Sequence, residues 1–185
     1  RKRPIAMMES KSRSNKDMKG LAKIAAQQLS DPSGPSVAIF DIGGFDTHAD
    51  QGGDNGEHAK KLKQFDDVIG TLRKHMGKTF NNTIIASLTE FGRTMSQNGG
   101  SGTEHGYGTA ILMAGGLLPK SRIISDWPGL EQKNLFEGRD LNSSIDARAV
   151  YASILARVLE SDHQKIVKDA FFNSDLPDMT KRIFL

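Results

Sequence analysis

The sequence predicts an α/β domain with a largely parallel sheet. Apolar runs typical of buried strands alternate along the chain with segments whose apolar residues recur at helical spacing. Each of these runs is followed by a polar or glycine-rich loop, as in folds that join strand to helix repeatedly. With 185 residues, the chain is long enough to pack one such domain without disulfides or other cross-links.

The first half of the chain predicts a helix, a strand and a second helix. Residues 18–29 have helical apolar spacing, and the proline- and glycine-containing segment 31–35 ends that helix. The apolar run 36–42 predicts a buried strand, and Gly43–Gly44 permits a tight turn after it. Residues 58–76 predict an amphipathic helix. Its apolar face consists of Leu62, Phe65, Val68, Ile69, Leu72 and Met76.

The second half predicts further strands and one long helix. The β-branched run 83–88 and the apolar run 109–114 indicate strands, and residues 122–125 indicate a short one. Ser144 or Asp146 is expected to cap the last long helix. The apolar stripe of that helix consists of Val150, Ile154, Leu155, Val158 and Leu159. The apolar end of the chain is expected to pack against the domain.

Charge divides the chain into a basic amino-terminal arm with a helix, residues 1–35, and the α/β domain, residues 36–185. Lysine and arginine are concentrated in the first 23 residues without interleaved aromatics, which favours a solvated arm over a nucleic-acid contact. A polyanion-binding arm is the weaker alternative, and steep salt dependence would reveal it. The sequence predicts no membrane span and no signal peptide. Because the chain does not begin with methionine, we expect it to be the carboxy-terminal piece of a longer protein.

The most informative loop carries Asp46 and His48 directly after a predicted strand. Because these residues are two apart, their side chains can share a face and bind one cation. The alternative is a carboxylate that caps a turn beside a solvent-exposed histidine. The chain has no cysteine, so any metal must be bound by imidazole nitrogen and carboxylate oxygen.

Two further loops carry candidate site residues. Glu90 follows a predicted strand and suits a metal ligand or general base, and Arg93 offers a planar fork for an oxyanion. Pairing of these two residues with each other is the alternative. His105, in a glycine-rich loop, suits a metal ligand or a donor to a phosphate or sulfate oxygen, or else a hydrogen bond to nearby backbone. Right-handed crossovers would bring the Asp46, Glu90 and His105 loops to one edge of a parallel sheet.

The remaining histidines and charges have structural interpretations. Glu57 and His58 are expected to begin a helix, and His75 to lie near the end of it. His163 is expected at the surface. For a later set of charged residues, two interpretations are equally good. The residues either position the site residues from behind, or they form ion pairs and helix caps. These residues are Asp126, Arg139, Asp140, Asp146 and Arg148.

Five ordered motifs resemble a bacterial family known as domain of unknown function 1501. They are GGFDTH (43–48), EFGRT (90–94), GTEHGYG (102–108), DWPGL (126–130) and GRDL (138–141). The resemblance extends from Val37 to Leu159. This chain has Phe45 where the family usually has tryptophan, and Glu104 where it usually has aspartate.

The resemblance implies membership of the alkaline phosphatase and sulfatase-like superfamily. It therefore implies a three-layer α/β/α sandwich, here as a partial domain, that hydrolyses small anionic phosphate or sulfate esters with a divalent metal such as zinc, manganese, calcium or magnesium. By that analogy Asp46, His48, Glu90 and His105 are metal ligands. Arg93 and Glu104 are then the expected catalytic residues. An export signal is common in the family, which implies a periplasmic or exported natural protein.

The residues that do not match the superfamily point to an alternative function. Phe91 stands where the superfamily often has a second ligand histidine, and residues 1–34 do not resemble its strand-and-nucleophile segment. We therefore expect an amino-terminal portion of the same protein to supply the nucleophile. The alternative is a catalytically inactive binding or accessory module that retains the fold.

Overall fold

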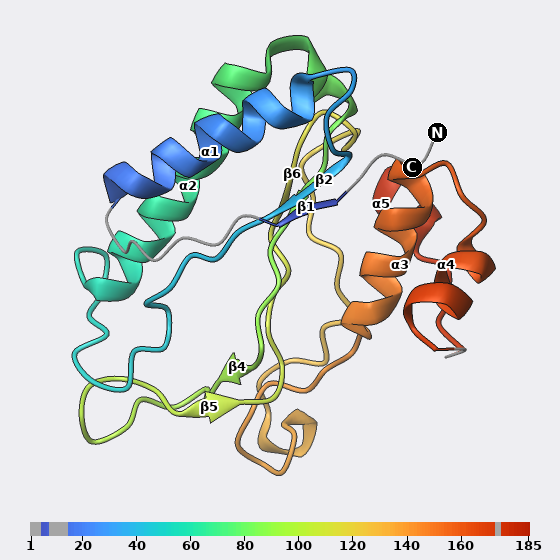
Figure 1. Ribbon diagram of the computed structural model, residues 1–185. Coiled ribbons are helices and arrows are strands. Elements are labelled where there is room, and N and C mark those ends of the chain that lie inside the picture. Colours follow the sequence, from blue (N-terminus) through green and yellow to red (C-terminus); the bar gives the residue numbers. More distant parts are fainter. Residues whose placement is uncertain (1–4, 8–14, 173–174) are drawn as a thin grey trace. The chain divides into compact units, whose positions relative to one another are not determined.

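The computed structural model describes residues 5–7, 15–172 and 175–185 (Figure 1). Residues 1–4 and 8–14 of the predicted basic arm lie outside this described part. The chain divides into two compact units. Unit 1 contains Arg1–Asn81 and Gln97–Thr103, and unit 2 contains Asn82–Ser96 and Glu104–Leu185.

Two helices that lie side by side form the core of unit 1 (Figure 1). They are α1, Asn15–Ser30, and α2, Glu57–Met76, so both predicted helices are confirmed. Their buried hydrophobic residues are Met18, Ala22, Ala25 and Ala26 on α1 and Val68, Leu72 and Met76 on α2. Three alanines on α1 leave space for the larger α2 side chains. Ile24, an apolar residue of α1, is exposed.

The ends of α2 agree with helix electrostatics. The helix begins at Glu57, whose carboxylate is favourable beside the positive end of the helix dipole. Arg73, Lys74 and His75 lie in the last turn, where positive charge is favourable. A 3-10 helix, η1, Gly77–Asn82, follows directly. The predicted placement of Glu57 and His75 is therefore confirmed.

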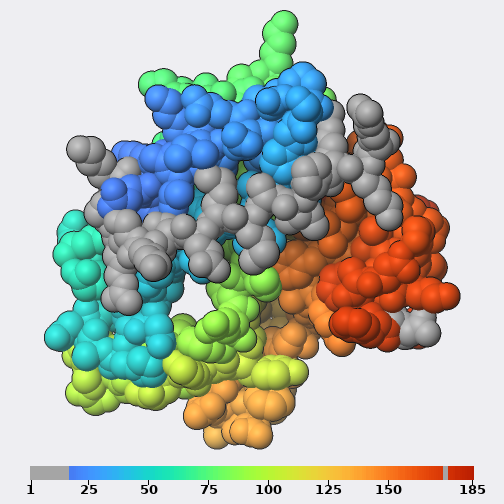
Figure 2. Space-filling model, viewed as in Figure 1, coloured from blue at the N-terminus to red at the C-terminus, as the bar shows by residue number. Residues whose placement is uncertain are grey.

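Unit 2 contains the other three helices and a second hydrophobic core. They are α3, Ala147–Val158, α4, His163–Ala170, and α5, Thr180–Phe184. The core consists of Ala149, Val150, Ala152, Ile154, Val167, Leu176, Met179 and Ile183. Figure 2 shows these helices, coloured orange to red, as closely packed on the visible face. The carboxy-terminal segment packs against α3, as its apolar sequence predicts.

Polar side chains cap a helix and form hydrogen bonds within this helical core. Asp146 caps α3, because its side chain accepts a hydrogen bond of 2.8 Å from the Arg148 backbone N–H. The buried Ser153 hydroxyl donates to the Ala149 carbonyl oxygen and accepts from the Met179 N–H, both at 2.8 Å. His163 is only 9% exposed. The prediction that it lies at the surface is wrong, because it begins α4 with its ring turned into the protein.

The strands are short. In unit 1, β1, Ile5–Met7, pairs in parallel with β2, Val37–Ile39. Unit 2 has two antiparallel pairs, each two residues long. One joins β3, Ile85–Ala86, to β6, Met113–Ala114, and the other joins β4, Gly92–Arg93, to β5, His105–Gly106. A short 3-10 helix, η2, Gln132–Asn134, precedes α3.

The predicted alkaline-phosphatase-like sandwich with a largely parallel sheet is therefore wrong for the described residues. The runs 36–42, 83–88 and 109–114 each contribute only two or three paired residues, and 122–125 contributes none. An apolar run indicates side chains that suit a sheet, whereas a strand also needs a partner for its backbone N–H and C=O groups. The spacing of apolar side chains does not predict which segment provides these backbone hydrogen-bond partners.

Candidate functional site

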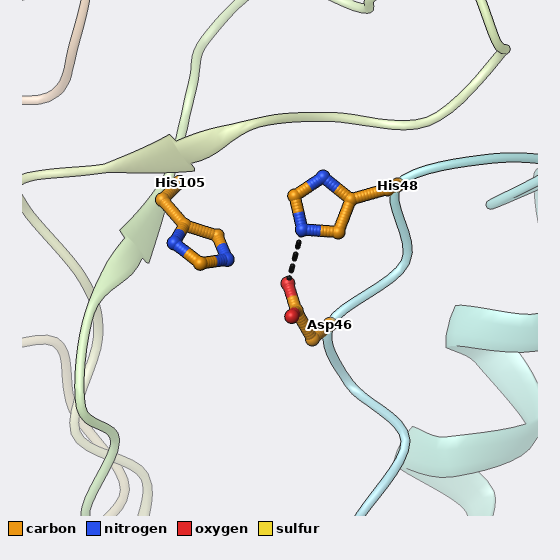
Figure 3. Close-up of side chains that lie close together, drawn as sticks. All are labelled: Asp46, His48 and His105. Carbon is orange, nitrogen blue, oxygen red and sulfur yellow. Dashed lines mark ion pairs between the residues drawn. The ribbon is translucent and has the colours of Figure 1, made fainter.

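Asp46 and His48 form an ion pair on the exposed loop that follows β2 in unit 1. The distance between Asp46 Oδ1 and His48 Nε2 is 3.0 Å, and their side chains are 49% and 44% exposed. Figure 3 shows this ion pair as a dashed line, together with the His105 side chain of β5. The structure thus brings together the two residues that the Asp-x-His spacing predicts on one face.

The segment that carries this pair is held against the glycine-rich segment 97–103. Asp50 N–H donates to the Gly100 carbonyl oxygen at 2.9 Å, and Gln51 N–H donates to that of Ser101 at 3.0 Å. Thr103 N–H donates to the Thr47 carbonyl oxygen at 3.2 Å. These backbone hydrogen bonds connect residues about fifty positions apart in the sequence, so the GGFDTH motif and the start of the GTEHGYG motif form one local structure.

The segments 46–51 and 97–103 together form a loop pair. Asn98 orders this loop pair through hydrogen bonds of its side-chain amide. Its Nδ2 donates to the His48 carbonyl oxygen at 2.9 Å, and its Oδ1 accepts from the N–H groups of Gly100 and Gly102, each at 2.9 Å. A Cβ at Gly102 would lie 2.3 Å from the His48 carbonyl carbon, so only glycine permits this approach. The hydrogen bonds of Asn98 fix the backbone directly beneath a candidate metal ligand.

Gln51 joins the two loops a second time. Its Oε1 accepts hydrogen bonds of 2.9 Å from the hydroxyls of both Thr47 and Thr103. Neither Gln51 nor Asn98 is among the residues that the sequence predicts for the site. An asparagine two residues before one glycine and four before another is the signal that indicates the role of Asn98, because its amide can cap both N–H groups.

In unit 2, the Glu90 and His105 loops meet as an antiparallel pair. Arg93 lies directly opposite His105 in the β4–β5 register, so their side chains share one face. The Phe91 ring stacks on the His105 imidazole, with centroids 3.8 Å apart and an angle of 20° between the planes. The stacking of Phe91 therefore restricts the orientation of the His105 ring.

Glu104 lies one position before His105, on the other face of the pair. Its backbone N–H donates to the Thr94 hydroxyl at 3.1 Å. Asp140, from the GRDL motif, bridges to Thr94 on the far side, and its Oδ2 accepts from Arg139 at 2.8 Å. The pKa of Arg139 is raised by that bond to Asp140 and, to a smaller extent, by the charges of Glu137 and Glu104. The charge of Glu104 thus acts on Arg139, and the predicted catalytic role of Glu104 stays a prediction.

The later charged residues form ion pairs and a helix cap, one of the two interpretations left open by the sequence. Asp146 caps α3 and pairs with Arg148, and Asp126 accepts hydrogen bonds from Arg182 at 2.9 and 3.0 Å. Glu90 is exposed on the loop between β3 and β4. Its predicted role as a ligand or base stays a prediction.

The Asp46–His48 pair suits a divalent metal by its chemistry. Zinc binds imidazole nitrogen and carboxylate oxygen at about 2.0–2.2 Å, which places two ligand atoms of a tetrahedral ion about 3.4 Å apart. The observed separation of 3.0 Å requires only a small adjustment to reach that value. Nitrogen and oxygen donors together also suit manganese, whereas calcium and magnesium prefer oxygen alone.

The fold and the loop pair define a helical protein with short strands that presents an aspartate and histidine on a hydrogen-bonded loop. The chain belongs to the family described as Protein of unknown function (DUF1501), whose model matches residues 2–171. Neither the curated proteins nor the solved structures provide a match. Among the helices of the described ranges, none is both long and apolar enough to cross a bilayer.

Proposed function

We propose that the protein is a metal-dependent hydrolase of phosphate or sulfate esters. The observation that carries this proposal is the Asp46–His48 pair, whose backbone is fixed by hydrogen bonds from the 97–103 segment. A loop that is both exposed and extensively hydrogen-bonded suits a binding site, because its side chains are accessible while its backbone is ordered. Placement in the alkaline phosphatase and sulfatase-like superfamily is part of the same proposal.

His105 is the proposed third ligand, as the resemblance to the alkaline phosphatase and sulfatase-like superfamily implies. Its imidazole nitrogen is a donor that zinc binds. Three protein ligands with an open fourth position are the usual arrangement of a catalytic zinc site.

Glu90, Arg93 and Glu104 complete the proposal. Arg93, opposite His105, is suited to bind the ester oxyanion through its planar fork. Glu90 is the proposed further ligand or general base, and Glu104 a catalytic carboxylate. A divalent ion held by these ligands would supply Lewis-acid stabilisation of an ester oxygen.

An ester hydrolysis assay tests the proposal. The natural full-length protein is loaded with zinc or manganese and assayed with p-nitrophenyl phosphate and p-nitrophenyl sulfate. We expect turnover that Asp46→Ala and His105→Ala each reduce at least about a hundredfold, as expected when a metal ligand is removed. His75→Ala, an exposed histidine on α2, is the matched control and should retain activity.

Two outcomes would contradict the hydrolase. One is the absence of turnover with every metal and both esters, and the other is turnover that survives both substitutions. Metal binding without turnover would instead favour the alternative, an inactive binding or accessory module.

A further inference from the structure

The first turn of α2 faces the loop that carries Asp46 and His48. The His58 ring lies edge-on to Phe45, with centroids 5.7 Å apart and an interplanar angle of 82°. Lys61 is three residues after His58 and therefore on the same side of the helix. Two residues of one helical face thus contact adjacent positions of the GGFDTH motif.

Gly44 provides the space that the Lys61 side chain occupies. A Cβ built on Gly44 would lie 2.5 Å from Lys61 Cε and 2.8 Å from Nζ. Gly44 also has a φ of +94°, a conformation that other residues rarely adopt. The ammonium group therefore lies over the backbone two residues before Asp46, in a position that a larger residue at Gly44 would block.

Lys61 differs from its neighbouring lysines in its charge environment. Lys60 pairs with Glu57 at 2.6 Å, and Lys63 pairs with Asp67 at 2.5 Å. For Lys61, the described residues provide no carboxylate within ion-pair distance, and the charge of Glu57 acts on it only at longer range. A half-buried lysine without a close carboxylate, held against a loop backbone, is suited to bind an anion as a point charge.

We propose that Lys61 binds the anionic group of the substrate, a phosphate or sulfate ester, beside the metal ligands Asp46 and His48. This inference rests on the proposed hydrolase function, because it places the charged group of the substrate beside the loop that carries Asp46 and His48. Asp46 alone would repel such an anion. A positive charge on the neighbouring helix offsets that repulsion and selects anionic over neutral esters.

Titration of inorganic phosphate by isothermal calorimetry, with and without one equivalent of zinc, tests this assignment. Lys61→Met removes the charge and keeps a side chain of similar length, and Lys61→Arg keeps the charge. Lys60→Met is the matched control, because it removes an adjacent lysine that is already paired. We expect Lys61→Met to weaken phosphate binding at least about tenfold, as for loss of a charge-assisted hydrogen bond. Lys61→Arg should restore most of the affinity, and Lys60→Met should change it less than about twofold.

The outcomes separate this inference from the hydrolase proposal. Equal phosphate affinity in Lys61→Met and Lys60→Met would overturn the role of Lys61, as would a protein that binds zinc but no phosphate. A protein that binds no zinc, yet loses phosphate binding only in Lys61→Met, would refute the metal site and support the anion site.

Discussion

The loop pair of unit 1 and the helical core of unit 2 are held together by different forces. In the loop pair, exposed residues such as His48 and Gly100 are ordered by backbone and amide hydrogen bonds. In the helical core, apolar side chains such as Ile183 and Val167 are almost fully buried. Burial contributes most of the stability of a domain, whereas hydrogen bonds near solvent contribute little net free energy but specify geometry. Stability and site geometry should therefore respond to different substitutions.

The core should show the largest effect on stability. Ile183→Ala removes a side chain that is 1% exposed, and we expect the free energy of unfolding to fall by about 2–5 kcal/mol. Urea denaturation measures this change. Leu185→Ala, two residues away at a position 77% exposed, should cost less than about 0.5 kcal/mol. Equal effects of the two substitutions would show that the α5 contact does not stabilise unit 2.

A substitution in the loop pair should change zinc affinity more than the free energy of unfolding. Asn98→Ala removes the hydrogen bonds to the backbone of His48, Gly100 and Gly102. We expect zinc affinity to fall about tenfold, while the free energy of unfolding changes by about 1 kcal/mol or less. Calorimetric titration and urea denaturation measure the two quantities. Asn134→Ala, which removes an amide hydrogen bond to Pro128 in unit 2, should leave zinc affinity unchanged; a similar loss there would refute a specific role for Asn98.

Substitution of the residue that caps α3 should have the smallest effect on the free energy of unfolding, and this effect should depend on pH. Asp146→Ala removes the cap and should cost about 1 kcal/mol, whereas Asp146→Asn retains a capping oxygen and should cost less. The Arg148 side chain, and to a smaller extent its backbone N–H, lowers the pKa of Asp146. The charge-dependent stability is therefore present above the unfolded-state pKa of about 3.9 and is lost as pH falls through the lower folded-state pKa.

Denaturation across a pH series tests the sign of this effect. The difference in unfolding free energy between the wild type and Asp146→Asn should be constant near neutral pH and shrink below about pH 4. A difference that grows as the pH falls would contradict the Arg148 interaction.

The sequence was a good guide to helices because their evidence is local. The spacing of Val68, Leu72 and Met76 defines a face whether or not its partner is known, and Asp146 caps its own helix. The strand predictions located β2, β3 and β6 but overestimated their length and their parallel pairing, because pairing is not local. Ile39 and Leu88 belong to runs that read as buried strands, yet both are exposed, and neither run contains a signal that specifies its partner.

The candidate site was predictable to the extent that its residues are close in sequence. The Asp46–His48 pair follows from a spacing of two. The hydrogen bonds between Asn98 and His48, and the approach of Lys61 to Gly44, depend on how distant segments pack. Arg93 does lie beside His105, but through an antiparallel pair rather than at the edge of a parallel sheet.

Zinc binding at Asp46 and His48 is measured directly by calorimetric titration of the wild type, the Asp46→Asn/His48→Gln double variant and His75→Gln. We predict that the wild type and His75→Gln bind one zinc ion with equal affinity. The double variant should bind it at least about a hundredfold more weakly, because two of the proposed metal ligands are lost. Equal zinc affinity in all three proteins would contradict a zinc site at Asp46 and His48.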